Sequence, residues 1–147
     1  MPNFQGSGFT MELPDDCMDA SSYAFVLPEN NGFSANLTVR FESAVHVSDL
    51  QAHVNLSLDA LKASVVDFVM INQVAGKRGA HHGVMSNFEW GAGESRMRIK
   101  QYCIITTGDV PRVYTLTAVD LASNADQSAP VFNRMMKNFI PNQEQLF

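Results

Sequence analysis

The chain has 147 residues, of which 46% are hydrophobic and 17% charged, and its formal net charge is -5 at pH 7. This composition is typical of a globular protein, and we expect residues 1–147 to form a single domain with one hydrophobic core. The acidic balance argues against a nucleic-acid-binding domain, which needs clustered lysine and arginine. No segment has the apolar length of a membrane-spanning helix, so we expect no stable insertion into a membrane.

The N-terminal third predicts short strands and no export signal. Residues 1–16 have neither a basic start nor a long apolar run, so we expect no signal peptide or lipoprotein leader, and a cytoplasmic location. Apolar-rich runs predict strands at 9–13 and 22–27, separated by a Pro-Asp-Asp turn. Residues 35–42 alternate between apolar and polar side chains, which predicts a strand that is buried on one face only.

Residues 48–66 predict the longest helix, which follows the third predicted strand. Apolar residues recur there at steps of three or four and form one stripe, made by Val47, Leu50, Val54, Leu58, Leu61 and Val65. Ser48 and Gln51 have the spacing of a capping box, in which both side chains satisfy amide groups that the first helical turn leaves free.

The second half predicts an antiparallel sheet followed by a second helix. Strands are expected at 68–74, 82–90, 96–105 and 112–119, joined in part by the glycine-containing connections GKRG and GAGES. Residues 128–139 predict a helix with Pro130 near its first turn. Such segregation of strands and helices indicates an α+β fold. The predicted fold is an antiparallel meander with one long helix after the third strand and a C-terminal helix.

Motifs for catalysis and metal binding are weak. His81 and His82 are neighbours on a predicted strand, where adjacent side chains point to opposite faces, so a shared metal is disfavoured. Cys17 and Cys103 are too far apart for a local metal or redox motif, and we expect two reduced thiols. The sequence has no GxSxG elbow and no phosphate-binding glycine loop that opens a helix. We therefore expect no enzyme activity, no metal and no cofactor.

Gln101 interrupts the most apolar row of the chain. On the predicted strand 96–105, it shares a face with Met97, Ile99, Cys103 and Ile105. A buried amide costs free energy unless its donors and acceptor are paired. Gln101 is either a core amide with local hydrogen bonds or an amide on a sheet face that contacts an elongated, mostly apolar partner. The residue pattern alone favours the core amide, because most buried polar groups are satisfied locally.

Several motifs occur in a recognisable order between residues 9 and 139. They are MELPDD (11–16), YAFVLPENN (23–31), ANLTVRF (35–41), the capped helix, HHGVMSNFEW (81–90) and RIKQY (98–102). Their order and spacing resemble the DcrB-related domain family, whose fold is PsbP-like. Within this family the chain is most similar to the effector-associated (Eag) chaperones of bacterial type VI secretion.

This resemblance implies a cytoplasmic homodimer that binds the hydrophobic N-terminal transmembrane segments of an effector and aids its loading onto the VgrG spike. It implies that Gln101 faces a largely apolar groove and bonds to the client helix. The same alignment implies further groove contacts at Ser22, Ala24, Asn36, Arg40 and Ser57. Ser22 and Ala24 are smaller or more polar than the branched apolar residues expected there, and Ser57 replaces a longer amide.

Two alternative functions remain open. A non-enzymatic adaptor of the same fold would bind folded partners, and its binding would survive deletion of the partner's hydrophobic segments. A small-molecule-binding domain or enzyme would use the region of His81, His82 and Glu89. No residue spacing supports this last alternative.

Overall fold

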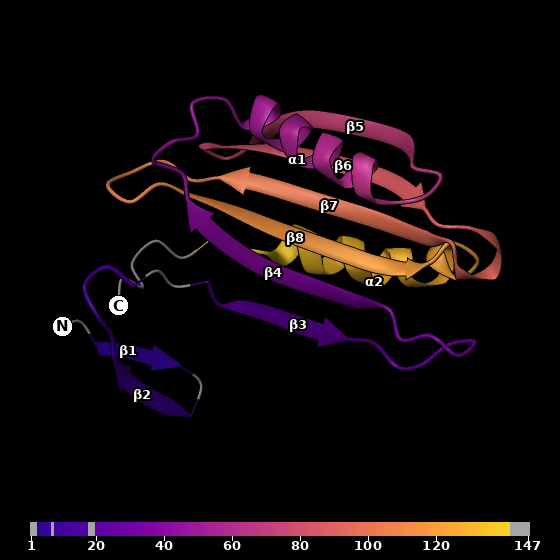
Figure 1. The fold of residues 1–147 in the computed structure, drawn as a ribbon, viewed down its shortest axis with the longest axis horizontal. Helices are drawn as coiled ribbons and strands as arrows, with labels where there is room; N and C mark the ends of the chain where they lie inside the picture. Colours follow the sequence, from indigo (N-terminus) through magenta and orange to yellow (C-terminus); the bar gives the residue numbers. More distant parts are fainter. Residues whose placement is uncertain (1–2, 7, 18–19, 142–147) are drawn as a thin grey trace.

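The computed structural model describes residues 3–6, 8–17 and 20–141 and contains two antiparallel sheets and two α-helices (Figure 1). In chain order the elements are β1 (Asn3–Gly6), β2 (Phe9–Glu12), β3 (Ser22–Val26), β4 (Asn36–Ser43), α1 (Leu50–Ser64), β5 (Val69–Arg78), β6 (His81–Trp90), the short 3-10 helix η1 (Gly93–Ser95), β7 (Met97–Ile105), β8 (Arg112–Leu121) and α2 (Ala125–Asn138). The α+β class predicted from the sequence is therefore confirmed. The small strand β1 was not predicted.

The main sheet combines the predicted meander with two strands from before the long helix. Its order is β3-β4-β8-β7-β6-β5, while β1 and β2 form a separate two-stranded sheet. Strands β5 to β8 pair consecutively, as predicted. The prediction that GKRG (76–79) connects two strands is wrong in its extent, because Gly76, Lys77 and Arg78 pair within β5 and only Gly79 and Ala80 form the turn before β6. The last strand of this meander, β8, then pairs with β4 along its whole length. This long-range pairing places β4 and β3 beyond the meander.

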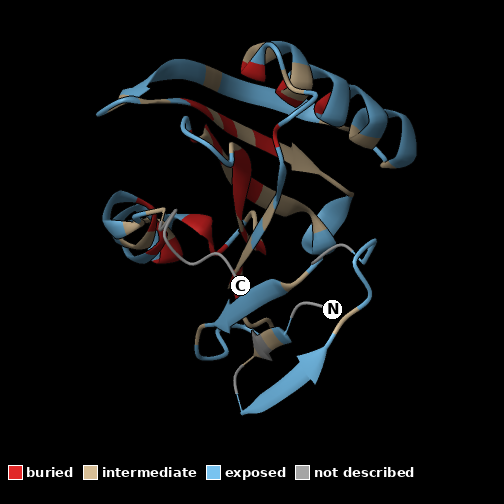
Figure 2. Ribbon diagram, turned by 90° about the vertical axis from the view of Figure 1, so that its left-hand side faces the viewer, coloured by how far each residue is buried: buried red, intermediate tan, exposed pale blue. Residues whose placement is uncertain are grey.

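The two helices lie on opposite faces of the main sheet (Figures 1 and 2). Helix α1 packs on β6 and β7, and its buried stripe joins a cluster that includes Leu58, Phe88 and Ile99. Helix α2 packs on β8, where Phe132 and Met136 join a second cluster. Successive strand residues point to opposite faces, so one sheet supplies both clusters. Full burial of a large apolar side chain contributes about 1.5–3 kcal/mol, which makes these two layers the main source of stability.

Helix α1 is shorter than the predicted range 48–66, and the predicted capping box is wrong. The cap is Asp49, whose extended backbone lets its Oδ1 accept hydrogen bonds from the amides of Gln51 (3.0 Å) and Ala52 (3.4 Å). The Gln51 side chain does not reach back to the cap. Its Nε2 instead donates to Gln73 Oε1 on β5 at 2.8 Å.

Helix α2 begins three residues before the predicted range 128–139, so Pro130 lies beyond its first turn. Its start is fixed by Asn124. The side chain of this residue donates to the Asn30 carbonyl at 3.0 Å and accepts from Asn31 Nδ2 at 2.9 Å. These contacts join residues more than 90 positions apart, so local sequence patterns could not reveal them. Within the described ranges, neither helix is long and apolar enough to cross a membrane.

The two outer strands of the main sheet differ in how they are protected. Every residue of β3 is exposed and none is charged. Strand β5 carries a register irregularity between Met70 and Asn72 and ends in Lys77 and Arg78. Bulges and charges are the usual protection of sheet edges, and β3 lacks both.

Candidate functional site

Five of the six predicted contact residues lie on one face of the main sheet. Ser22 pairs with Arg40, and Ala24 pairs with Thr38, so these β3 and β4 residues point the same way. Asn36 shares their face because it lies two residues before Thr38 on β4. Thr38 pairs with Thr117 on β8, which in turn pairs with Gln101 on β7. This is the face on which α1 packs further along the sheet, over β6 and β7.

We call the part of this face that lies beyond α1 the open face. It is formed by the side chains of Ser22, Ala24, Asn36, Thr38, Arg40, Thr115, Thr117 and Gln101. Ser22, Ala24 and Arg40 are exposed, whereas Asn36, Thr38, Thr117 and Gln101 are half-buried. The open face is therefore more polar than the apolar groove that the family resemblance implies.

Ser57, the sixth predicted contact residue, lies on the helix and not on the sheet. It is exposed and stands one turn after His53, whose Nε2 is 3.2 Å from Glu42 Oε1 on β4. Residues four apart on a helix lie on the same side. Ser57 therefore lies on the flank of α1 that faces β4. The structure thus brings all six predicted residues to one region, and their role in binding stays a prediction.

Gln101 has one long hydrogen bond. Its Nε2 donates to Thr117 Oγ1 at 3.4 Å, near the upper limit for such a bond. Ser86 lies beside it on β6 but accepts a hydrogen bond from Gln73 Nε2 at 3.0 Å. The half-buried amide of Gln101 is therefore neither sealed in the core nor fully paired within the described residues.

Sequence reasoning missed a row of polar residues that crosses all six strands. Thr38, Thr117 and Gln101 continue in register through Ser86 and Gln73, and Ala24 is the one apolar member, at the β3 end. We call these six residues the polar row. The alternation of 35–42 had indicated the polar side of Thr38. However, strand register across long-range pairs is not encoded by local patterns.

Neither thiol nor histidine chemistry is assembled at the open face. Burial raises the pKa of Cys103, despite the nearby hydroxyl of Thr115, whose Oγ1 lies 3.7 Å from its sulfur. A buried thiol with a raised pKa is a poor nucleophile. His81 and His82 point to opposite faces, as predicted, because they are neighbours on β6. Within the described residues, no group of three or more His, Cys, Asp or Glu side chains is arranged to hold a metal.

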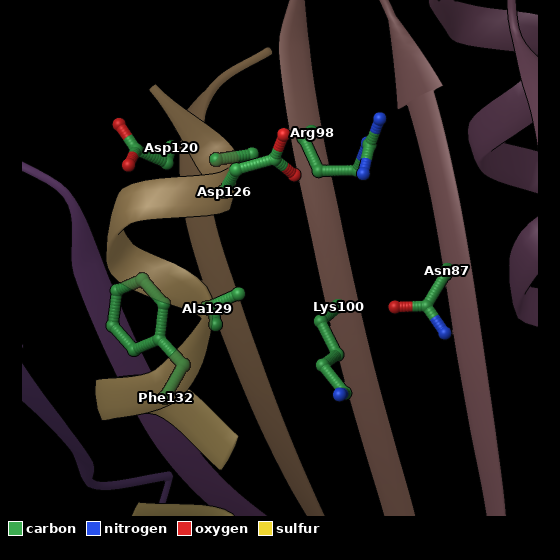
Figure 3. A pocket seen from close by; sticks show the side chains of 9 residues that line it. Asn87, Arg98, Lys100, Asp120, Asp126, Ala129 and Phe132 are labelled. Atoms are coloured by element: carbon green, nitrogen blue, oxygen red, sulfur yellow. The ribbon is translucent and has the colours of Figure 1, made fainter. Parts of the chain in front are cut away.

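A small pocket lies on the opposite face of the sheet, beside α2 (Figure 3). Lys100 and Arg98 from β7 line it together with Asp126 and Phe132 from α2. Burial lowers the pKa of Lys100, whose Nζ donates to Asn133 Oδ1. The cavity volume is about 90 Å³, whereas pockets for drug-sized ligands have roughly 300–1,000 Å³. The pocket is therefore too small for a substrate of ordinary size, which disfavours the small-molecule alternative at this position.

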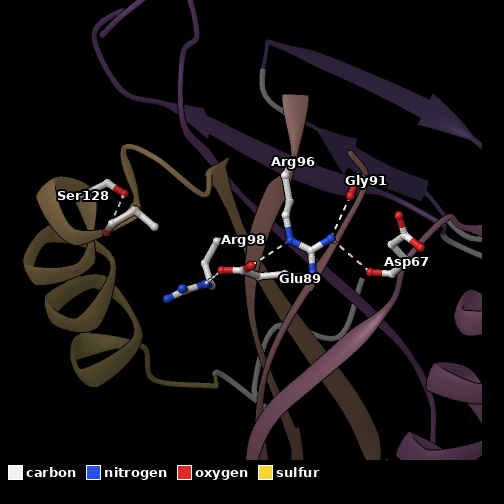
Figure 4. A network of polar contacts seen from close by, with 7 residues as sticks. Asp67, Glu89, Gly91, Arg96, Arg98 and Ser128 are labelled. Carbon is white, nitrogen blue, oxygen red and sulfur yellow. Dashed lines mark hydrogen bonds and ion pairs between the residues drawn. The ribbon is translucent and has the colours of Figure 1, made fainter. Parts of the chain in front are cut away.

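Glu89, which the small-molecule alternative invoked, is already engaged in a structural network (Figure 4). Its carboxylate accepts from Arg96 Nε at 2.9 Å and from Arg98 Nε at 2.5 Å. Arg96 also donates to the carbonyls of Asp67 and Gly91 at 3.0 and 2.7 Å. Burial raises the pKa of Glu89, but the hydrogen bonds and charges of the two arginines outweigh this effect, so its pKa lies below the ordinary value. The network joins the segment after α1 to the β6–β7 turn.

Comparison with solved structures identifies the fold. PA94 of Pseudomonas aeruginosa, a protein of unknown function, matches with a TM-score of 0.75 and 17% identity over 97% of each chain. The cyanobacterial PsbP protein of Synechocystis matches with a TM-score of 0.51 and 9% identity, over 90% of this chain and 98% of that one. The yeast Ran-binding protein Mog1p matches with a TM-score of 0.48 and 14% identity, over 87% of this chain and 72% of that one.

The matches to PA94 and to the cyanobacterial PsbP protein confirm the predicted PsbP-like α+β fold. At such low identity they show the fold alone. No protein-family model matches the chain, and no curated protein matches it in sequence.

Proposed function

We propose that the protein is a chaperone of the effector-associated (Eag) type. It binds and shields the hydrophobic N-terminal transmembrane segments of a type VI secretion effector in the cytoplasm, and it aids loading of the effector onto the VgrG spike. The observation that carries this proposal is the gathering of Ser22, Ala24, Asn36, Arg40 and Gln101 on one face. Helix α1 packs on the same face but over β6 and β7, and Ser22, Ala24 and Arg40 beside it are exposed, so this part of the face is accessible to a client.

The mechanism is equilibrium shielding. A transmembrane helix has about 20 mostly apolar residues, and in water its surface is exposed at a cost of roughly 25 cal/mol per Å². Binding to the open face removes part of that surface from water without ATP or a cofactor. Gln101 bonds to the client through the amide groups that its single 3.4 Å hydrogen bond leaves available. Asn36 and Ser57 orient the client and do not supply most of the affinity.

The proposed working form is a homodimer joined through β3. Tyr23, Phe25 and Val26 on this strand are 58%, 50% and 65% exposed. An uncharged edge strand without a bulge can pair with a second copy of itself. Antiparallel pairing about a two-fold axis perpendicular to the sheet would keep both open faces on the same side. The two copies of α1 would then border one continuous surface.

The dimer is tested by placing charge on β3. The double variant Tyr23→Asp/Phe25→Asp should shift the mass measured by light scattering from two chains to one, because the carboxylates of the two paired β3 strands would lie close together and repel each other. The matched control is Leu56→Asp on α1, which is 72% exposed and lies outside β3. A monomeric wild-type protein, or a dimer that survives the double substitution, would contradict pairing through β3.

The client is tested by affinity purification of the tagged protein from its native bacterium, with mass spectrometry of the proteins that co-purify. We expect one dominant large partner, whose capture is abolished when its N-terminal hydrophobic segment is deleted. Deletion of an equally long polar segment of the partner is the matched control and should leave capture unchanged. A partner that is retained after the hydrophobic deletion would instead support the adaptor function.

A further inference from the structure

The side chains of the polar row have hydrogen-bond partners in the part of the row that α1 covers, and they lack most of them in the rest of the row. Under and beside α1, Gln51 Nε2 donates to Gln73 Oε1 at 2.8 Å, and Gln73 Nε2 donates to Ser86 Oγ at 3.0 Å. Ser86 is only 1% exposed, so these bonds replace water within the covered part. The covered part of the row therefore pairs its hydrogen-bonding groups with each other and with α1.

The open part of the row keeps unused hydrogen-bonding capacity. Gln101 and Thr117 share one bond of 3.4 Å, and Thr38 makes no side-chain hydrogen bond to any described residue. All three side chains are half-buried and reach solvent. A purely apolar partner that covered them would remove their water without replacing its hydrogen bonds, which lowers affinity.

The spacing of these three residues matches that of a helix. Thr38, Thr117 and Gln101 lie on three adjacent strands, in register. Adjacent strands are about 4.8 Å apart, and one helical turn rises about 5.4 Å. Over the two intervals the mismatch is about 1.2 Å, which flexible side chains can absorb. A helix that lies across the strands along this row would present one residue per turn to each of the three side chains.

The neighbouring rows of the open face do not present accessible hydrogen-bonding side chains on all three of these strands. In the row of Arg40, Thr115 and Cys103, the threonine is only 7% exposed and lies against the cysteine sulfur. In the row of Asn36, Val119 and Ile99, two of the three members are apolar. The polar row is therefore the place on the open face where hydrogen-bonding side chains from three consecutive strands are accessible.

We propose that Thr38, Thr117 and Gln101 select a client helix that carries small hydrogen-bonding residues, such as serine or threonine, once per turn along one side. The helix crosses the strands along the polar row and is otherwise apolar. This inference rests on the proposed chaperone function and names the kind of segment that the open face prefers. Thr38 and Thr117 become specificity-determining residues that the family resemblance did not indicate.

The probes are two carrier fusions, each with an N-terminal 20-residue leucine–alanine helix. One helix has serine at positions i, i+4 and i+7 on one side, and the other has alanine at these positions. We expect the full-length protein to bind the serine helix at least fivefold more tightly in a biosensor titration. Thr38→Val and Thr117→Val should each abolish most of this preference, because valine keeps the shape and removes the hydroxyl. Affinity for the alanine helix should rise and not fall, since no hydroxyl then loses its water without a replacement hydrogen bond.

The matched control is Thr10→Val, the same substitution at an exposed position of the separate β1–β2 sheet. It should leave the preference intact. Equal binding of both helices, or a preference that survives both substitutions, would overturn the selection by the polar row and leave the shielding function standing. Failure to bind either helix, with both fusions soluble and the protein folded, would overturn the shielding function and the selection together.

Discussion

The main sheet has one half that α1 covers and one half that it leaves open, and the polar row crosses both. In the covered half, Gln73 and Ser86 are paired with each other, and apolar side chains such as Phe88 fill the space beside them. In the open half, Thr38 and Gln101 lie in the same row but keep free hydrogen-bonding capacity. Residues of the same chemical kind thus serve stability where a helix covers them and remain available for recognition where it does not.

The largest expected effect comes from removing a large buried side chain from the half of the sheet that α1 covers. Phe88 is 1% exposed and its ring centroid lies 5.3 Å from that of Phe68. Phe88→Ala should lower the free energy of unfolding by about 3–5 kcal/mol, since it leaves a cavity beneath α1. The control is Arg40→Ala on the open face, which truncates a long exposed side chain and should change stability by about 0.5 kcal/mol or less. Similar losses in urea denaturation would contradict the distinction between the halves.

The second test uses the polar row itself. Ser86→Ala removes the acceptor of Gln73 Nε2 in a buried place and should cost about 1–3 kcal/mol. Gln101→Ala, on the next strand of the same row, should cost about 0.5 kcal/mol or less because the amide is half-buried and has one long bond. The Gln101 variant should nevertheless retain less client in co-purification. If both variants lose equal stability in urea denaturation, Gln101 is a structural amide and its role in client binding loses its support.

Much of the fold could be predicted because its signals are local. The alternation of residues 35–42 and the apolar stripe of α1 indicated elements that the structure contains. The cap at Asp49 was missed because Ser48 and Gln51 have the spacing of a capping box, which predicts a helix start one residue earlier. The start of α2 was missed because Asn124 is held by Asn30 and Asn31 across the molecule.

The candidate site was predictable only in part. Gln101 was visible as a polar residue within an apolar row, and the family resemblance supplied the other five positions. The row itself depends on the pairing of β4 with β8, two strands separated by some seventy residues and by α1. Neither propensity nor periodicity contains that register. Thr117 was therefore unremarkable in the sequence, although it lies directly between Thr38 and Gln101.

The smallest expected effect concerns the far end of the covered half, where Arg96 joins the segment after α1 to the β6–β7 turn through Glu89, Asp67 and Gly91. Because the folded-state pKa of Glu89 is below its ordinary value of 4.5, the carboxylate stabilises the fold fully above that value. That contribution is lost as the pH falls through the folded-state pKa. Glu89→Gln should cost about 1 kcal/mol at pH 7, because solvent around the partly exposed Arg98 weakens the ion pair.

The pH dependence separates the charge of Glu89 from its packing. Denaturation midpoints of the wild type and of Glu89→Gln should differ at pH 7 and converge as the pH falls through the lowered folded-state pKa of Glu89. Glu94→Gln in the exposed turn is the matched control, and its denaturation midpoint should follow that of the wild type over the same pH range. A difference for Glu89→Gln that stays constant with pH would mean that the side chain acts through packing and neutral hydrogen bonds. In that case the two arginines would hold the turn without needing the carboxylate charge.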